Sequence, residues 1–175
     1  MDGQLVERAR AGDADAFDQL VREKVDAVYR LALGILGESA DARDATQEAF
    51  VTAWQKLPTV RDTSKFDGWL NRVTVNACRM ALRKKKTVRE IRLLPEADFP
   101  AADRSRALAQ AKAVAFDKAF EQLSVDQRAL LLDHHLDHRS VEELSGRLGV
   151  PIGTVKSRLY TARKALESAL KEVKQ

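Results

Sequence analysis

The sequence predicts an all-α fold made of two small helical domains joined by a flexible linker. Apolar residues recur at helical spacing through most of the 175 residues, and only 8 glycines and 4 prolines interrupt them. Residues 93–106, LLPEADFPAADRSR, break this pattern with two prolines among charges of mixed sign. Such a composition is typical of a linker, so we divide the chain into residues 1–90, a linker over 91–110, and residues 111–175.

The first domain is expected to contain four helices. A short helix comes first, the second is capped by Asp15 and stopped by Gly37, and the third begins at Ser39 or Asp41. The fourth covers about residues 67–86. The residues of this fourth helix that we expect to face the core are Trp69, Leu70, Val73, Ala77, Met80 and Ala81.

The second domain is expected to begin with two helices over residues 107–123 and 125–136, the latter capped by Ser124. A short helix over residues 141–148 then follows its cap, Ser140. The starts of the helices over residues 125–136 and 141–148 rest on the serine that precedes each apolar run.

The final helix carries the strongest functional signal. It follows Gly149 and Pro151, which suit a helix end and a helix entry, so it forms a helix-turn-helix with residues 141–148. Its apolar stripe consists of Val155, Leu159, Ala162 and Leu166. The polar and cationic residues between them face outward, where such a helix enters a DNA major groove.

The charge pattern supports contacts with a polyanion. The net charge is −4 over residues 1–60, +7 over 61–92, −2 over 93–135 and +3 over 136–175. Two basic blocks separated by acidic stretches indicate two such contacts.

Other classes of protein are disfavoured by the composition. The one cysteine excludes a disulfide framework and a cysteine zinc site. No apolar run approaches the roughly 18 residues of a membrane span, and MDGQLVERAR lacks the apolar segment of a signal peptide. We therefore expect a cytoplasmic protein without direct membrane insertion.

Two sets of motifs resemble one known family. GTVKSRLYTARKAL, preceded by SVEELSGRLGVP, resembles the fourth domain of bacterial sigma factors of the extracytoplasmic-function (ECF) group. DARDATQEAFVTAWQKL resembles the core-polymerase-binding helix of sigma domain two, and FDGWLNRVTVNACRMALRKKK resembles the promoter-reading helix of that domain. The resemblance implies an alternative sigma factor, with no enzymatic activity and no cofactor, that directs core RNA polymerase to promoters.

The resemblance also implies roles for individual residues. Those expected to bind the clamp helices of the polymerase β′ subunit are Asp44, Gln47 and Glu48. Those expected to bind the minus-ten region as a melted non-template strand are Arg61, Lys65, Arg72, Asn76, Arg79, Arg83 and Lys84. Those expected at the minus-thirty-five duplex are Thr154, Lys156, Ser157, Arg158 and Tyr160. The other implied partners are the flap of the polymerase β subunit and an anti-sigma factor.

Within these segments, some residues are assigned to DNA contact and others to the hydrophobic core. Asn76 matches the base-reading asparagine of the family, and the basic run over residues 83–86 lies where upstream duplex should pass. Phe50 and Trp54 are assigned to the core rather than to the polymerase interface, because large aromatic residues on an apolar stripe are usually buried.

Two other interpretations remain open. In LDHHLDHRS, His134 and His138 have a spacing that can hold zinc on a continuous helix, as in a hydrolase. The helix is expected to end there, ahead of Ser140, so no metal site is predicted. An ordinary transcription regulator would share the helix-turn-helix, but it leaves the polar face around Gln47 and the basic helix of Asn76 unexplained.

Overall fold

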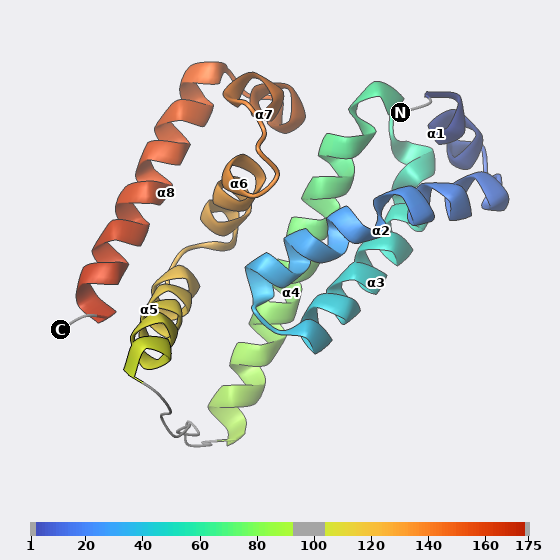
Figure 1. Ribbon diagram of the computed structural model, residues 1–175. Coiled ribbons are helices and arrows are strands. Elements are labelled where there is room, and N and C mark those ends of the chain that lie inside the picture. The colour runs from blue at the N-terminus through green and yellow to red at the C-terminus, as the bar shows by residue number, and fades with distance from the viewer. Residues whose placement is uncertain (1–2, 93–103, 174–175) are drawn as a thin grey trace.

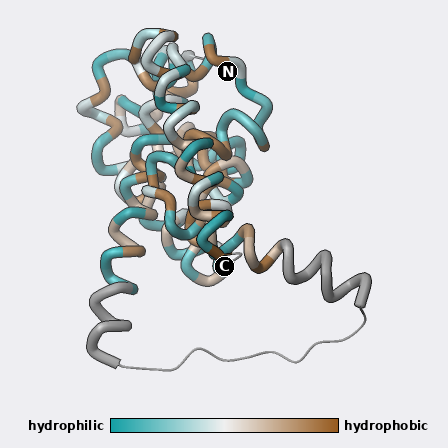
Figure 2. Tube along the Cα trace, turned by 90° about the vertical axis from the view of Figure 1, so that its left-hand side faces the viewer, coloured by the Kyte–Doolittle hydropathy of each residue, from teal (hydrophilic) through white to brown (hydrophobic). Residues whose placement is uncertain are grey.

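Every regular element that the structure describes is a helix, which confirms the predicted all-α fold (Figure 1). The computed structural model describes residues 3–92 and 104–173, and the side chains of residues 3–85 and 113–173. Residues 3–92 form the N-terminal bundle and residues 104–173 form the C-terminal bundle. Hydrophobic and hydrophilic stretches alternate along the helices (Figure 2), as expected where each helix buries one face.

The four expected helices of the N-terminal bundle are present. Its elements are α1 Gly3–Arg10, α2 Ala14–Leu36, α3 Ser39–Lys56, the 3₁₀ turns Leu57–Thr59 and Thr63–Lys65, and α4 Phe66–Arg92. Gly37 ends α2 in the left-handed conformation, with φ of 76°, and its amide donates to the Leu33 carbonyl at 2.8 Å. This is the predicted glycine stop.

The predicted cap of α2 was wrong. Asp13, not Asp15, is the N-cap, and its carboxylate accepts a hydrogen bond from the Ala16 amide at 3.0 Å. Asp13 is favoured because Arg8 pairs with the same carboxylate at 2.7 Å. The Ala16 amide and the Arg8 guanidinium together lower the pKa of Asp13 from its ordinary value.

One residue of α4 was assigned to the wrong face. Met80 is 61% exposed, although its apolar side chain favoured burial. Ala77 and Cys78 hold the core positions of this turn, and the helical rotation places Met80 with Asn76, four residues earlier, on the exposed face.

The C-terminal bundle matches its sequence signals closely. Its helices are α5 Arg104–Glu121, α6 Val125–His135, α7 Val141–Leu148 and α8 Ile152–Val173. Ser124 and Ser140 cap α6 and α7, each in a capping box with the Gln or Glu three residues later. Gly149 ends α7 with φ of 67°, and α8 packs the stripe of Val155, Leu159 and Ala162 into the core, so the helix-turn-helix is confirmed.

Both ends of the expected linker lie in helices. Residues 91–92 belong to α4 and residues 104–110 to α5, because RSRALAQ consists mostly of good helix formers. The remainder of the linker, residues 93–103, lies outside the described residues.

The two bundles are in direct contact. α6 lies between α8 and the N-terminal bundle, where it packs against α2 and α4, and α7 packs against α4 (Figure 1). Ala129 of α6 joins the hydrophobic core of the N-terminal bundle, with Val125 and Leu132 packed beside it. The sequence made no prediction about this arrangement.

The cap of α7 generates a stability prediction. Ser140→Ala removes a hydroxyl that accepts a hydrogen bond from the Glu143 backbone amide at 3.1 Å. The substitution should lower the free energy of unfolding by about 1 kcal/mol. Urea unfolding followed by circular dichroism measures this change. Ser168→Ala, at an exposed site inside α8, is the control and should leave stability unchanged or slightly raised. Equal effects of the two substitutions would contradict the capping role.

Candidate nucleic-acid interface

The outer face of α8 presents most of the residues expected to read duplex DNA. Lys156, Ser157, Arg158 and Tyr160 are exposed, while Thr154 is half-buried. This rotation follows from the buried stripe on the opposite side of the helix. The Ser157 hydroxyl donates to the Thr154 carbonyl at 3.0 Å, and Tyr160 has 67% of its surface exposed. The helix therefore presents hydroxyl, ammonium and phenol groups together.

A second polar face follows α4. Arg72, Asn76, Arg83 and Lys84 are exposed along it, and Arg79 is half-buried. The Arg79 guanidinium donates to the Asn76 side-chain oxygen at 2.6 Å. The same guanidinium reaches Asp126 of α6 at 2.8 Å. Two of the expected minus-ten residues are thus held together by protein contacts.

One lysine of the basic run over residues 83–86 is held by carboxylates of a neighbouring helix. Lys85 pairs with Glu38 at 2.9 Å and with Asp41 at 2.8 Å, so it ties α4 to the start of α3. The hydrogen bond with Asp41 and then that with Glu38 raise the pKa of Lys85. The side chain of Lys86 lies outside the described residues.

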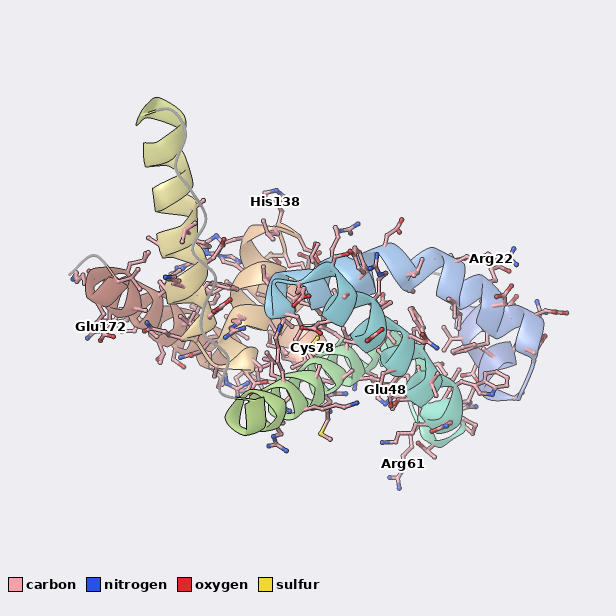
Figure 3. All side chains as sticks on the ribbon, turned by 90° about the horizontal axis from the view of Figure 1, so that it is seen from below. Arg22, Glu48, Arg61, Cys78, His138 and Glu172 are labelled. Carbon is pink, nitrogen blue, oxygen red and sulfur yellow. The ribbon has the colours of Figure 1, made fainter. Side chains whose placement is uncertain are left out.

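The loop between α3 and α4 carries Arg61 and Lys65. Both are exposed, and Arg61 points away from the body of the protein (Figure 3). Lys65 pairs with Asp62 at 3.1 Å, and the Ser64 hydroxyl and Lys65 lower the pKa of the Asp62 carboxyl. The loop is anchored to α1, because Arg10 donates to the Val60 carbonyl at 3.2 Å.

The residues expected to bind polymerase share the exposed side of α3. Asp44, Gln47 and Glu48 are all exposed, since the alanines of the helix take the core positions. This gives an acidic and amide-bearing surface that is complementary to a basic partner helix.

An apolar groove of about 580 Å³ lies beside that surface, between α2 and α3. The residues that line it include Phe17, Gln47, Phe50, Val51 and Trp54. Phe50 is buried as predicted, whereas Trp54 is 39% exposed and packs on Phe17 with ring centroids 4.9 Å apart. Its assignment to the core was therefore wrong. The sequence did contain a sign of the groove. Phe50 and Val51 are adjacent, so the apolar surface of α3 is broader than a single buried stripe.

Some members of the two sets of residues expected to contact DNA line one cleft. The cleft measures about 610 Å³ and lies between α4, α6 and α8. One wall includes Arg72, Asn76 and Arg79, and the other includes Ser157 and Arg158. Sequence reasoning placed these residues on separate domains and did not predict that they face each other.

The histidine cluster has a local structural role. α6 ends at His135, so His134 and His138 do not share a helix. His134 Nδ1 lies 2.8 Å from the Arg139 carbonyl, and His138 has a φ of 51° in the turn. Within the described residues, no group of three or more His, Cys, Asp or Glu side chains is placed to hold a metal ion. None of the described helices is long and apolar enough to cross a membrane.

Comparisons with known proteins agree on one family. Residues 20–88 match sigma-70 region 2, and residues 113–166 match sigma-70 region 4. The chain is 36% identical to the ECF RNA polymerase sigma factor SigM of Mycobacterium tuberculosis, covering 97% of this chain and 84% of SigM. It is 31% identical to the RNA polymerase sigma-H factor of Pseudomonas aeruginosa, covering 97% and 93% of the two chains.

Solved structures show the same fold. RpoE of Bartonella quintana, in complex with the anti-sigma factor NepR, matches with a TM-score of 0.59 and 26% identity over 89% of this chain and 96% of RpoE. CnrH, in complex with the cytosolic domain of CnrY, matches with a TM-score of 0.65 and 24% identity over 98% and 97% of the two chains.

Proposed function

Since this chain belongs to the ECF RNA polymerase sigma factors and directs transcription initiation, we propose that it reads two promoter elements with two separate helices. The observation that carries the proposal is the exposure, on α4 and on α8, of polar faces within segments that match regions 2 and 4. The catalytic chemistry belongs to the polymerase, so this chain acts by binding alone, in the cytoplasm where transcription takes place.

Core polymerase is proposed to dock on α3. Asp44, Gln47 and Glu48 supply the polar contacts, and the groove that includes Trp54 receives apolar side chains of the partner. The expected partner is the pair of clamp helices of the β′ subunit. Aromatic residues are enriched at the centres of interfaces and polar residues surround them, so the groove with Trp54 suits the centre of this interface and the polar residues of α3 suit its rim.

The minus-ten element is proposed to bind α4 and the preceding loop. Asn76 reads a base edge, because its amide offers both a donor and an acceptor. The cations that would hold the backbone of the melted strand are Arg61, Lys65, Arg72, Arg79, Arg83 and Lys84. Binding of the extruded bases then offsets part of the free energy of melting.

The minus-thirty-five duplex is proposed to bind α8. Lys156, Ser157 and Tyr160 approach base edges in the major groove, while Thr154 and Arg158 hold the backbone. We also propose contact with the β flap, and control by an anti-sigma factor such as the one that binds the related RpoE. Residues 1–90 would form the domain that binds polymerase and the minus-ten element, and residues 111–175 the domain that binds the minus-thirty-five element. The linker between them would be the segment that connects α4 to α5.

Run-off transcription tests this proposal. Purified core polymerase is incubated with a pooled library of upstream sequences, with and without the protein. Defined transcripts that require the protein are the expected result, and their sequences reveal both promoter elements. If no transcript appears and the protein alone shifts duplex DNA from the pool, it is an ordinary transcription regulator. The proposed polymerase-binding role of α3 and the minus-ten role of α4 would then be wrong.

Asn76→Ala should impair promoter melting more than it impairs core binding, because the amide contacts bases that are exposed only in the melted strand. Permanganate reactivity of promoter thymines measures melting, and fluorescence anisotropy measures core affinity. Gln19→Ala, an exposed amide on α2, is the matched control. Equal losses of melting and core binding would contradict the base-reading role.

Lys156→Ala should weaken promoter binding by about 1–3 kcal/mol if this side chain reads a base. Competition binding of the holoenzyme to promoter variants measures the change, which should be concentrated at one base pair. Lys171→Ala, near the end of α8, removes a lysine that pairs with Glu167 at 2.7 Å and serves as the control. A loss that is uniform across all variants would reassign Lys156 to the phosphate backbone.

A further inference from the structure

Two basic side chains from different helices meet at the end of α6. A guanidinium nitrogen of Arg163, on α8, lies 3.5 Å from the Nε2 atom of His135, the last residue of α6. Both side chains are exposed. A neutral imidazole can accept a hydrogen bond from Arg163 at this atom, whereas a protonated imidazole has only donors and repels the guanidinium. The contact therefore depends on the protonation state of His135.

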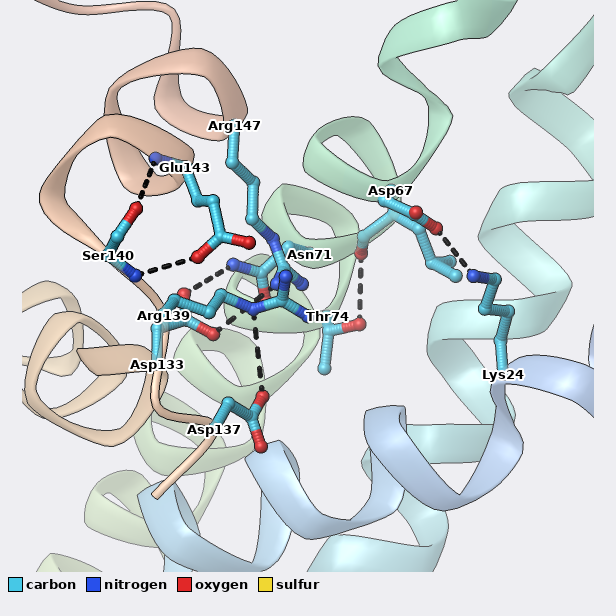
Figure 4. Close-up of polar contacts among 11 residues, drawn as sticks. Lys24, Asp67, Asn71, Thr74, Asp133, Asp137, Arg139, Ser140, Glu143 and Arg147 are labelled. Carbon is cyan, nitrogen blue, oxygen red and sulfur yellow. Dashed lines mark hydrogen bonds and ion pairs between the residues drawn. The ribbon is translucent and has the colours of Figure 1, made fainter. Parts of the chain in front are cut away.

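The carboxylates on either side of His135 in the sequence are directed to other partners. Asp133 accepts a hydrogen bond from Asn71 of α4 at 2.9 Å, and Asp137 lies 3.9 Å from the Arg139 guanidinium (Figure 4). Both carboxylates thus belong to the polar cluster between α4, α6 and α7. Neither of them pairs with His135.

The carboxylate one turn after Arg163 on α8 is engaged as well. Glu167 pairs with Lys171 at 2.7 Å. Among the side chains that the structure describes, residues 3–85 and 113–173, no carboxylate forms an ion pair with Arg163 or His135. Two basic groups that converge without a carboxylate can both donate to one bound anion, and charged donors make the stronger hydrogen bonds.

The surroundings of His135 disfavour its protonated form. Partial burial, then His134 of α6 and Arg163 of α8, lower the pKa of His135. The helices α2, α4 and α7 also pack on α6, but none of their described charged groups contributes to this shift. His134 is itself held by the Arg139 carbonyl, 2.8 Å from its Nδ1 atom. An anion beside His135 acts in the opposite direction, because it favours the charged imidazole.

The pair lies beside the face of α8 that is expected to meet DNA. Arg163 follows Lys156 by seven residues and Tyr160 by three, so the three share one side of the helix. Seven residues extend a helix by about 10 Å, and the major groove is about 12 Å wide. A helix with Lys156 at base edges therefore brings Arg163 close to the phosphates at the edge of the groove. Neither Arg163 nor His135 lines the cleft between α4, α6 and α8.

We propose that His135 and Arg163 form a binding site for one backbone phosphate of duplex DNA, and that His135 takes up a proton from solvent when this phosphate binds. In the free protein, neutral His135 accepts a hydrogen bond from Arg163. In the complex, the imidazolium and the guanidinium both donate to oxygens of the phosphate. This inference rests on the proposed function of α8, and it adds a contact from α6 that the sequence did not suggest.

Duplex binding by the full chain at two pH values tests the site. The probe is a fluorescein-labelled 30-base-pair duplex of mixed sequence, read by anisotropy at low salt and at pH 5.5 and pH 8.0. Binding that takes up a proton becomes tighter as the pH falls, and one unit of pKa change corresponds to about tenfold in affinity. The ratio of affinities at pH 5.5 and pH 8.0 should be at least about fivefold larger for the wild-type protein than for His135→Gln.

His135→Lys separates charge from packing. Lysine carries its charge at both pH values and is well tolerated at the end of a helix. This variant should bind the duplex at pH 8.0 within about twofold of the wild-type affinity at pH 5.5, and it should lose the same part of the pH dependence as His135→Gln. A residue with only a structural role would not be rescued in this way, so weak binding by His135→Lys at pH 8.0 would contradict the proposal.

His138→Asn is the matched control. His138 is also exposed, and it has a φ of 51°, a conformation that asparagine tolerates. This variant should keep the pH dependence of the wild-type protein, and circular dichroism verifies that all variants keep their helix content. If His135→Gln keeps the pH dependence as well, or if the wild-type chain binds the duplex at neither pH, the proposal is wrong.

The dependence on salt identifies the ligand as phosphate. Each phosphate contact contributes about 0.9 to the slope of log affinity against log salt concentration. The double variant His135→Gln, Arg163→Gln should therefore have a slope shallower by about one at pH 5.5. Weaker binding with an unchanged slope would overturn the phosphate site. These measurements omit polymerase, so a failure of run-off transcription with the pH dependence intact would reject the promoter-reading proposal and keep this site.

Discussion

Burial of the Asp133 carboxylate is the constraint on which the relative position of the two bundles depends. An unpaired carboxylate at 2% exposure would be strongly unfavourable, and its partners come from two other helices. Asn71 donates from α4 to one oxygen of the carboxylate at 2.9 Å, and the Arg147 guanidinium approaches the other oxygen from α7 at 3.7 Å, so the cluster ties α6 and α7 to α4. The backbones of α4 and α7 also approach closely here, because a Cβ atom on Gly68 of α4 would lie 2.3 Å from the Arg147 carbonyl oxygen.

Within each bundle, a simpler rule decides which residues are available for binding. Apolar stripes set the rotation of each helix about its axis, and the remaining positions are then exposed. On α3 the alanines are buried, which leaves Gln47 on the exposed side of the helix. On α8 Val155 and Leu159 are buried, which leaves Lys156 and Tyr160 exposed. The binding faces are thus a consequence of core packing, and a change of core residues that rotates a helix would move its functional face.

The parts of this structure that sequence could predict are those with local causes. The bounds of α7 were predicted because a serine cap, a capping-box glutamate and a terminal glycine all lie within ten residues. Met80 and Trp54 were wrongly assigned to the core. Their apolar character favours burial, but it does not show which edge of an apolar stripe is left uncovered by the neighbouring helices. The Asn71–Asp133 contact joins residues 62 positions apart, and no local periodicity encodes such a pair.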